Sequence, residues 1–92
     1  MNKNQNATDV VFNENEWAIL RYLYHRDNVT SIDDNDIDII AHGLNVEKPL
    51  AVLTVAKLYN EGWVSRVFDQ NLKERYVLSL EGFDMMKARK LH

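Results

Sequence analysis

Residues that commonly carry out catalysis or bind metals are few in this chain, and their spacing does not suit such chemistry. With no cysteine among its 92 residues, the chain has no thiolate nucleophile, disulfide framework or Cys-based zinc site. Its three histidines lack the H-x-x-x-H spacing that places two imidazoles on one helix face, and its serines lack a G-x-S-x-G setting. Three glycines are too few for a loop that cradles phosphate.

One acidic run resembles the start of a calcium-binding EF-hand loop. The segment Asp34-Asn35-Asp36-Ile37-Asp38 has the initial spacing, but the sixth position is Ile39 instead of Gly and the twelfth is Asn45 instead of Glu. Its carboxylates instead suit the positive N-terminus of a helix that begins near residue 37. We therefore predict that the chain is not an enzyme and holds neither a metal nor a cofactor.

Charge is distributed unevenly along the chain, whose formal net charge is −3. Residues 1–45 hold three basic and eight acidic residues, whereas residues 46–92 hold eight basic and six acidic ones. Binding of nucleic acid by bulk attraction needs an excess of Lys and Arg, so the net charge counts against that mode. Because the acidic run comes first, we expect the negative charge to lie away from a mildly basic surface formed by the second half.

The second half gathers cations around a turn-like segment at residues 70–73. Cations at such a tip suit phosphate contacts, which position a duplex without specifying its sequence. Alternatively, the tip belongs to a solvated hairpin in which the cations pair across the strands with Asp69 and Glu74. The group comprises Arg66, Gln70, Asn71, Lys73 and Arg75.

The elements that must position these residues begin with a helix at about residues 14–27. Asn13 and Glu16 have the spacing of a capping box, and Phe12 and Trp17 have that of a hydrophobic staple. A short β-prone stretch follows at residues 29–31, and the stripe at residues 37, 40, 41 and 44 predicts a short second helix. Pro49 fits the first turn of a third helix at about residues 47–60.

Beyond Gly62 the periodicity changes to that of strands. Residues 63–69 and 75–80 predict a β-hairpin, and Ser79 caps a final helix that carries Phe83, Met85 and Met86 on its packed side. The expected fold class is therefore α+β, mostly α. We predict a flexible N-terminal tail at residues 1–12 and one domain at residues 13–92. Without a signal peptide or an apolar run of about 18 residues, we expect a cytoplasmic protein with no membrane partner.

Two stretches of the chain have the residue spacing of known motifs. The first is Ile40-Ala41-x-x-Leu44-x-Val46, with Val55-x-x-Leu58-x-x-x-Gly62-Trp63-Val64 after it. The second is Tyr76-x-Leu78-Ser79-x-x-Gly82. Over about residues 14–90 these motifs make the chain resemble the winged helix-turn-helix family of MarR-like and PadR-like transcriptional regulators. The second motif is similar to the family's Tyr-x-Leu-Thr-x-x-Gly, in which the hydroxyl residue caps the last helix. The resemblance implies a three-helix core, a β-hairpin wing and a C-terminal helix.

The resemblance also implies that the third helix enters the major groove of double-stranded DNA while the wing reaches the backbone. That helix supplies Lys48, Thr54, Lys57 and Asn60 as candidate DNA contacts, in addition to the five residues of the wing. It departs from the usual pattern, because Leu50, Val52, Leu53 and Ala56 stand where polar readers are expected. Three of these, Val52, Leu53 and Ala56, are candidates for contact with thymine methyl groups. The alternative is that Leu50, Val52 and Leu53 are covered by protein, either the N-terminal tail or a second subunit.

The sequence thus favours a small DNA-binding transcriptional regulator, with a winged-helix protein-interaction or dimerisation module as the alternative. Phe83, Met85, Met86 and Leu91 are more apolar residues than one contact face of a peripheral helix needs. We therefore also expect a homodimer formed through the first and last helices, since twofold dimers are the commonest soluble oligomers. The residues specify neither an operator sequence nor an effector ligand.

Overall fold

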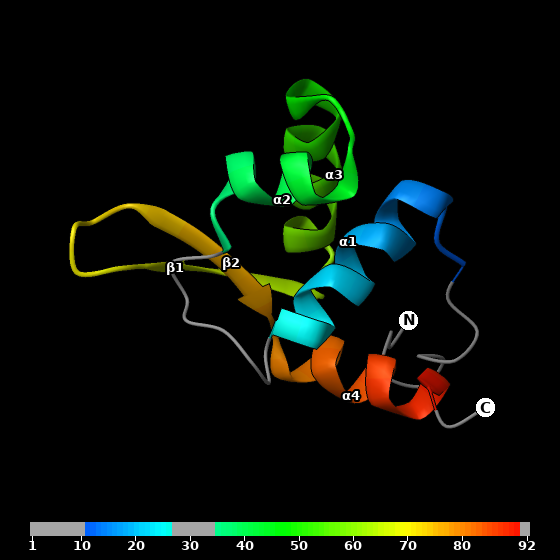
Figure 1. Ribbon diagram of the computed structural model, residues 1–92. Coiled ribbons are helices and arrows are strands. Elements are labelled where there is room, and N and C mark those ends of the chain that lie inside the picture. Colours follow the sequence, from blue (N-terminus) through cyan, green and yellow to red (C-terminus); the bar gives the residue numbers. More distant parts are fainter. Residues whose placement is uncertain (1–10, 27–34, 91–92) are drawn as a thin grey trace.

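The computed structural model describes residues 11–26 and 35–90. Within them the chain forms α1 (Glu14–Arg26), α2 (Ile37–Leu44), α3 (Lys48–Asn60), β1 (Val64–Phe68), β2 (Glu74–Leu78) and α4 (Leu80–Lys90), as Figure 1 shows. This order confirms the predicted three-helix core, hairpin and closing helix. The predicted strand at residues 29–31 and most of the predicted tail lie outside the described residues.

The start of α1 is fixed by the predicted capping box. The Glu16 N–H donates to Oδ1 of Asn13 at 2.8 Å, and the Asn13 N–H donates to Oε1 of Glu16 at 2.9 Å. The staple forms as well, with the rings of Phe12 and Trp17 5.4 Å apart, edge to face. Phe12 is buried and also meets Trp63, so the folded unit begins before residue 13, where the sequence placed its boundary.

The acidic run before α2 acts as a helix cap, as predicted. Asp36 is the N-cap residue, and its Oδ1 accepts hydrogen bonds from the N–H groups of Asp38 at 2.7 Å and Ile39 at 3.1 Å. Asn45 ends α2 in the left-handed conformation at φ 56°, and Pro49 stands in the first turn of α3. In the described part of the chain no single helix could cross a membrane. Only α2 and α3 together have the length and composition of a span, and they meet at a bend of 113°.

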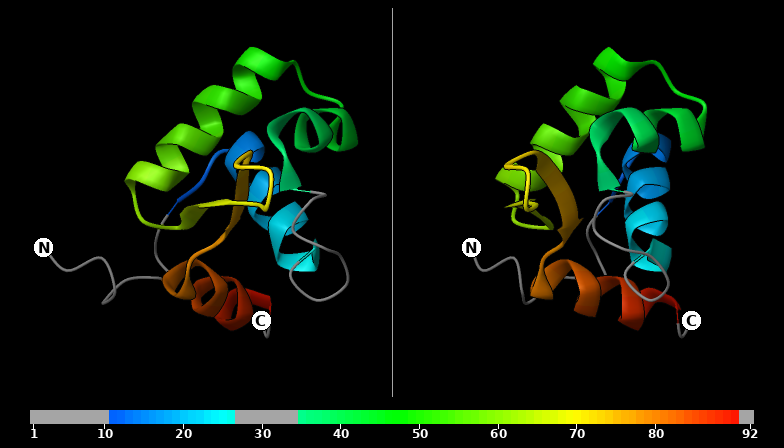
Figure 2. Two further views of the ribbon diagram at one scale, coloured as in Figure 1. Left: turned by 90° about the vertical axis from the view of Figure 1, so that its left-hand side faces the viewer. Right: turned by 60° about the vertical axis from the view of Figure 1, so that its left-hand side comes forward.

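The hairpin pairs β1 and β2 in antiparallel register, with Val64 opposite Leu78 and Phe68 opposite Glu74. Residues 69–73 form its tip. Leu72 lies there in the left-handed conformation at φ 63°, and it is 81% exposed. The hairpin and this tip are called the wing below. In Figure 1 the wing projects from the body of the molecule, and in Figures 1 and 2 α3 and α4 lie at opposite ends.

The closing helix α4 is held against the exit of the hairpin. The Ser79 hydroxyl caps it, accepting from the Gly82 N–H at 2.9 Å and donating to the Gly62 carbonyl at 2.6 Å. Met85 and Met86 are buried in the core of the same chain, and Phe83 packs against Tyr24 with ring centroids 5.3 Å apart. These three residues are therefore largely used within the domain, which weakens the sequence argument that they provide a dimer contact.

Candidate nucleic-acid interface

The face of α3 that points away from the core is mostly aliphatic. Ala51, Val55 and Leu58 are buried, whereas Val52 is 44% exposed and Leu53 is 69% exposed. Ala56 and Asn60 are exposed too, one and two turns after Val52. In the described part of the chain nothing covers these side chains, so the predicted departure from a polar face is present in the structure.

Thr54, which the sequence offered as a DNA contact, faces inward. Its side chain is buried, and its hydroxyl donates to the Leu50 carbonyl one turn earlier at 2.8 Å. This local bond satisfies the hydroxyl without a partner outside the helix. Thr54 therefore packs in the core and does not face a base edge.

The two lysines of α3 are exposed, but each has a carboxylate partner. Lys48 Nζ lies 2.9 Å from Asp38 Oδ1, and both side chains are more than half exposed. Lys57 Nζ lies 2.7 Å from Oε2 of Glu16, a side chain that is only 3% exposed. Burial would raise the pKa of Glu16, but Lys57 and the Asn13 N–H outweigh it and hold the pKa below its usual value. Lys57 thus ties α3 to the cap of α1, a link that sequence spacing does not reveal.

Four of the predicted wing residues are exposed. The side chain of Arg66 extends from β1 toward α3. Its guanidinium lies 5.1 Å from the ring centroid of Tyr59 and 3.5 Å from Oε2 of Glu74. Gln70, Asn71 and Lys73 lie at the tip. The Lys73 ammonium has no ion pair with any residue that the structure describes.

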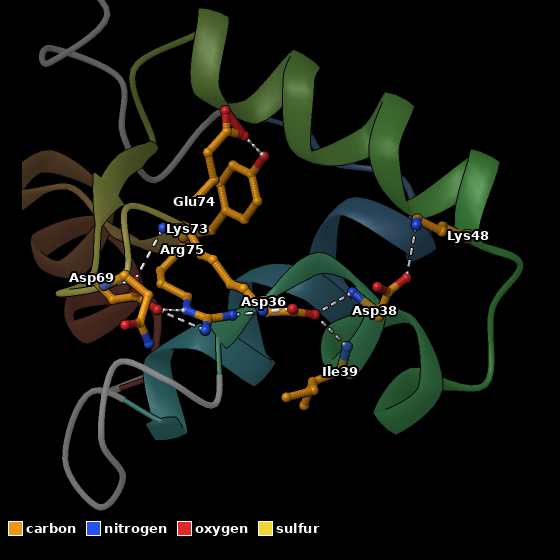
Figure 3. Close-up of polar contacts among 10 residues, drawn as sticks. Asp36, Asp38, Ile39, Lys48, Asp69, Lys73, Glu74 and Arg75 are labelled. Atoms are coloured by element: carbon orange, nitrogen blue, oxygen red, sulfur yellow. Dashed lines mark hydrogen bonds and ion pairs between the residues drawn. The ribbon is translucent and has the colours of Figure 1, made fainter.

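Arg75 was predicted to contact DNA, but in the structure it is buried and its guanidinium is paired with two carboxylates (Figure 3). Its Nε and one terminal nitrogen lie 2.9 and 2.7 Å from Oδ2 of Asp69, and its other terminal nitrogen lies 3.0 Å from Oδ2 of Asp36. The cross-strand Arg–Glu pair that the sequence left open as an alternative forms between Arg66 and Glu74, whereas the buried Arg75 pairs with Asp69 at the tip and with Asp36 outside the hairpin. Arg75 is a structural residue that joins the wing to the start of α2.

Both carboxylates that hold Arg75 also fix backbone. Oδ1 of Asp69 accepts from the N–H groups of Asn71 at 2.7 Å and Lys73 at 3.0 Å, which shapes the tip. The Lys73 N–H is the largest cause of the lowered pKa of Asp69, followed by the Asn71 N–H and Arg75. Burial opposes ionisation of Asp36, but the N–H groups at the start of α2 and Arg75 together lower its pKa. The position of the wing relative to α2 is therefore set by charge-assisted bonds.

A hollow of about 140 Å³ lies between α3 and the wing. It is lined from the helix side by Val52, Val55, Ala56 and Tyr59, from the hairpin by Arg66 and Tyr76, and from α2 by Ile37. Side chains of α3 and of the wing thus border one surface. We call this surface the α3–wing face. Among the described residues no group of three or more His, Asp or Glu side chains is placed to hold a metal ion.

Comparison of the chain with protein-family models and with curated proteins finds no match. Solved structures match it in fold. MepR of Staphylococcus aureus, a transcription regulator of the multidrug efflux pump MepA, superposes with a TM-score of 0.74 at 19% identity, over 96% of this chain and 65% of that one. The chain has the winged-helix fold.

Two further solved structures are similar to the chain in fold. A crystal structure of the S. aureus MepR–DNA complex gives a TM-score of 0.71 at 20% identity, covering 88% of this chain and 55% of that one. The Streptomyces coelicolor transcriptional regulator PcaV, solved with its natural ligand, gives 0.69 at 15% identity, covering 87% and 54%. This winged-helix chain therefore spans only 54 to 65% of the length of the three proteins.

Proposed function

We propose that this winged-helix chain is a DNA-binding transcriptional regulator, with α3 in the major groove and the wing on the phosphate backbone. The observation that carries the proposal is the α3–wing face, which brings an exposed helix and the exposed cations of the hairpin together. In this fold a helix of the helix-turn-helix commonly lies in the major groove. That one structure of the same fold is a DNA complex supports the proposal.

The contacts divide by chemistry into two groups. Lys48, Arg66 and Lys73 supply cations for phosphates, and Gln70 and Asn71 supply hydrogen bonds at the wing tip. Asn60 is the one side-chain amide on the outer face of α3. Lys57 remains a weaker candidate, because moving its ammonium to a phosphate would leave the buried Glu16 carboxylate without its cation.

The test is a fluorescence-anisotropy titration of mixed-sequence duplex DNA over a series of salt concentrations. Loss of one phosphate contact lowers the slope of log K against log salt by about 0.9. We expect that change for Lys73→Gln, whose ammonium has no ion pair to lose among the described residues. Lys87→Gln is the matched control, because Lys87 is an exposed lysine on α4, and α4 lies at the opposite end of the molecule from α3 (Figure 2).

No binding at about 50 mM salt would exclude the proposal, since salt at this level leaves phosphate contacts strong. Equal slopes for Lys73→Gln, Lys87→Gln and the natural chain would exclude a phosphate contact by Lys73 at the wing tip. The alternative function is a protein-interaction module, which is favoured by the exposed side chains of Leu53, Phe68 and Leu72. It predicts that duplex DNA does not bind at any salt concentration.

The homodimer through α1 and α4 is also part of the proposal. A hollow of about 220 Å³ lies there, lined by Trp17, Tyr24, His25, Met86 and the two arginines Arg21 and Arg89. The aromatic rings and the methionine of this hollow offer a contact for a twofold partner, which would place two copies of α3 on one duplex. Light scattering at tens of micromolar protein tests it, and a monomeric mass would refute it.

A further inference from the structure

The outer face of α3 carries a short aliphatic patch at the place where the proposed function puts base edges. We call Val52, Leu53 and Ala56 the apolar strip. All three are exposed, and Leu53 is 69% exposed, so no described part of the chain occupies the strip. The residues lie at i, i+1 and i+4, which puts them on one side of the helix within about 6 Å along its axis.

Cations border the strip on both sides. At about 100° per residue, Lys48 lies about 40° to one side of Val52, and Lys57 lies about 40° beyond Leu53 on the other side. Lys48 shares an exposed ion pair with Asp38, and such pairs contribute little to stability. Its ammonium can therefore leave Asp38 and bind a DNA phosphate at little cost. An apolar centre with cations at its edges matches the layout of a groove, where phosphates flank the base edges.

Aliphatic side chains limit which bases can face them. They form no hydrogen bonds, so an edge that exposes only donors and acceptors would be desolvated without compensation. Thymine is the one base whose major-groove edge carries a methyl group. The 6 Å length of the strip corresponds to about two base-pair steps of 3.4 Å.

We propose that the apolar strip reads thymine methyl groups, so that the chain prefers A·T pairs at two neighbouring positions of its site. This inference rests on the proposed DNA-binding function and adds the class of sequence that is bound. A protein occupant fits the strip less well, because specific interfaces bury roughly 800 Å² on each partner. One valine, one leucine and one alanine offer only a small part of that area.

The decisive experiment removes the methyl group and nothing else from the DNA. Anisotropy titrations compare an alternating dA–dT duplex with the same duplex in which deoxyuridine replaces every thymidine. Phosphates and base-pair hydrogen-bonding groups are the same in both. We expect the thymidine duplex to bind roughly tenfold more tightly, which corresponds to two methyl contacts that each bury about one CH₂ equivalent.

A double variant, Val52→Ser with Leu53→Asn, assigns the preference to the strip. Both sites are exposed, and retention of the fold is checked by circular dichroism. The variant keeps Ala56, which has the smallest side chain of the strip, so we expect it to lose most of the preference for the thymidine duplex. The matched control is Leu80→Asn, which changes an 84% exposed leucine at the start of α4. Leu80 does not line the hollow of the proposed dimer contact, so this variant should keep the preference for thymidine.

Each result has one meaning. Equal affinity of the natural chain for both duplexes would overturn the thymine proposal while leaving DNA binding intact. A thymidine preference that is undiminished in the double variant would also overturn it, because the methyl groups would then be read elsewhere. No binding of either duplex at about 50 mM salt would refute the proposed function itself.

Discussion

Gly82, in the first turn of α4, gives a sharp test because two physical effects predict opposite signs. Helix propensity alone predicts that Gly82→Ala stabilises the protein by about 1 kcal/mol. In the structure, however, an added Cβ would lie 2.0 Å from the Trp63 carbonyl oxygen and 3.0 Å from the Trp63 carbonyl carbon. Both atoms are backbone, so no side-chain rotation relieves the overlap. Steric conflict should therefore outweigh propensity.

The magnitude follows from what must move. The Trp63 carbonyl accepts the Ser79 N–H at 3.0 Å, so shifting it weakens a bond that joins the hairpin to α4. Overpacking costs about 1–3 kcal/mol and a lost hydrogen bond about 1 kcal/mol. After subtracting the propensity gain, we expect a net loss of about 2 kcal/mol. For a domain of this size that loss lowers Tm by roughly 8–16 °C.

Urea unfolding followed by tryptophan fluorescence measures the change, because Trp63 is buried next to the substituted site. Gly43→Ala is the matched control. Its added Cβ would come within 3.0 Å of the Tyr22 ring, the end of a side chain and not backbone, so the change should stay within about 1 kcal/mol. A Gly82→Ala variant as stable as the natural chain would show that α4 does not approach the hairpin as described.

Three further outcomes are expected. Leu72→Gly should raise the free energy of unfolding by about 0.5–1 kcal/mol, because it relieves φ 63° at an exposed side chain; a lower urea midpoint would contradict this. Asp36→Asn keeps a capping oxygen but loses the charge beside Arg75, so its urea midpoint should be lower at pH 7. Since the pKa of Asp36 is lowered by folding, its ionised form stabilises the protein above about pH 4, and the difference should shrink as pH falls below that value; a constant difference down to pH 2 would refute this origin. Glu74→Gln removes the carboxylate beside Arg66 and should tighten binding of duplex DNA at low salt, and unchanged affinity in anisotropy would exclude Arg66 as a contact.

Features that depend on neighbours in the sequence were predictable. The capping box of Asn13 and Glu16 and the hydroxyl cap at Ser79 were predicted and are confirmed. The acidic run was predicted to suit the start of the second helix, and the structure shows that Asp36 is the residue of the run that caps it. Each needs only three or four residues and the geometry of one helix turn. The order of the elements follows from the same local signals.

The directions in which side chains point, and the contacts they make between different helices and strands, were not predictable in the same way. Thr54 was taken as a reader because hydroxyls bind bases, yet its position on the helix turns it inward. Arg75 was assigned to phosphate from its residue type, but the fold brings Asp36 and Asp69 to it from separate segments. No spacing in the sequence encodes the meeting of α2 with the wing, since it depends on how the whole core packs.

Negative charge lies closer to the proposed DNA contacts than the sequence indicated. The sequence suggested that acidity lies away from the contact surface, but Asp38 pairs with Lys48, and Glu74 lies beside Arg66 on the α3–wing face. Each phosphate contact by Lys48 or Arg66 therefore exchanges one anion for another, which reduces the net gain from the backbone. A face balanced in this way holds DNA weakly by charge alone. Contacts with the bases then have to supply a larger share of the affinity, and on α3 the residues available for that are the apolar strip and Asn60.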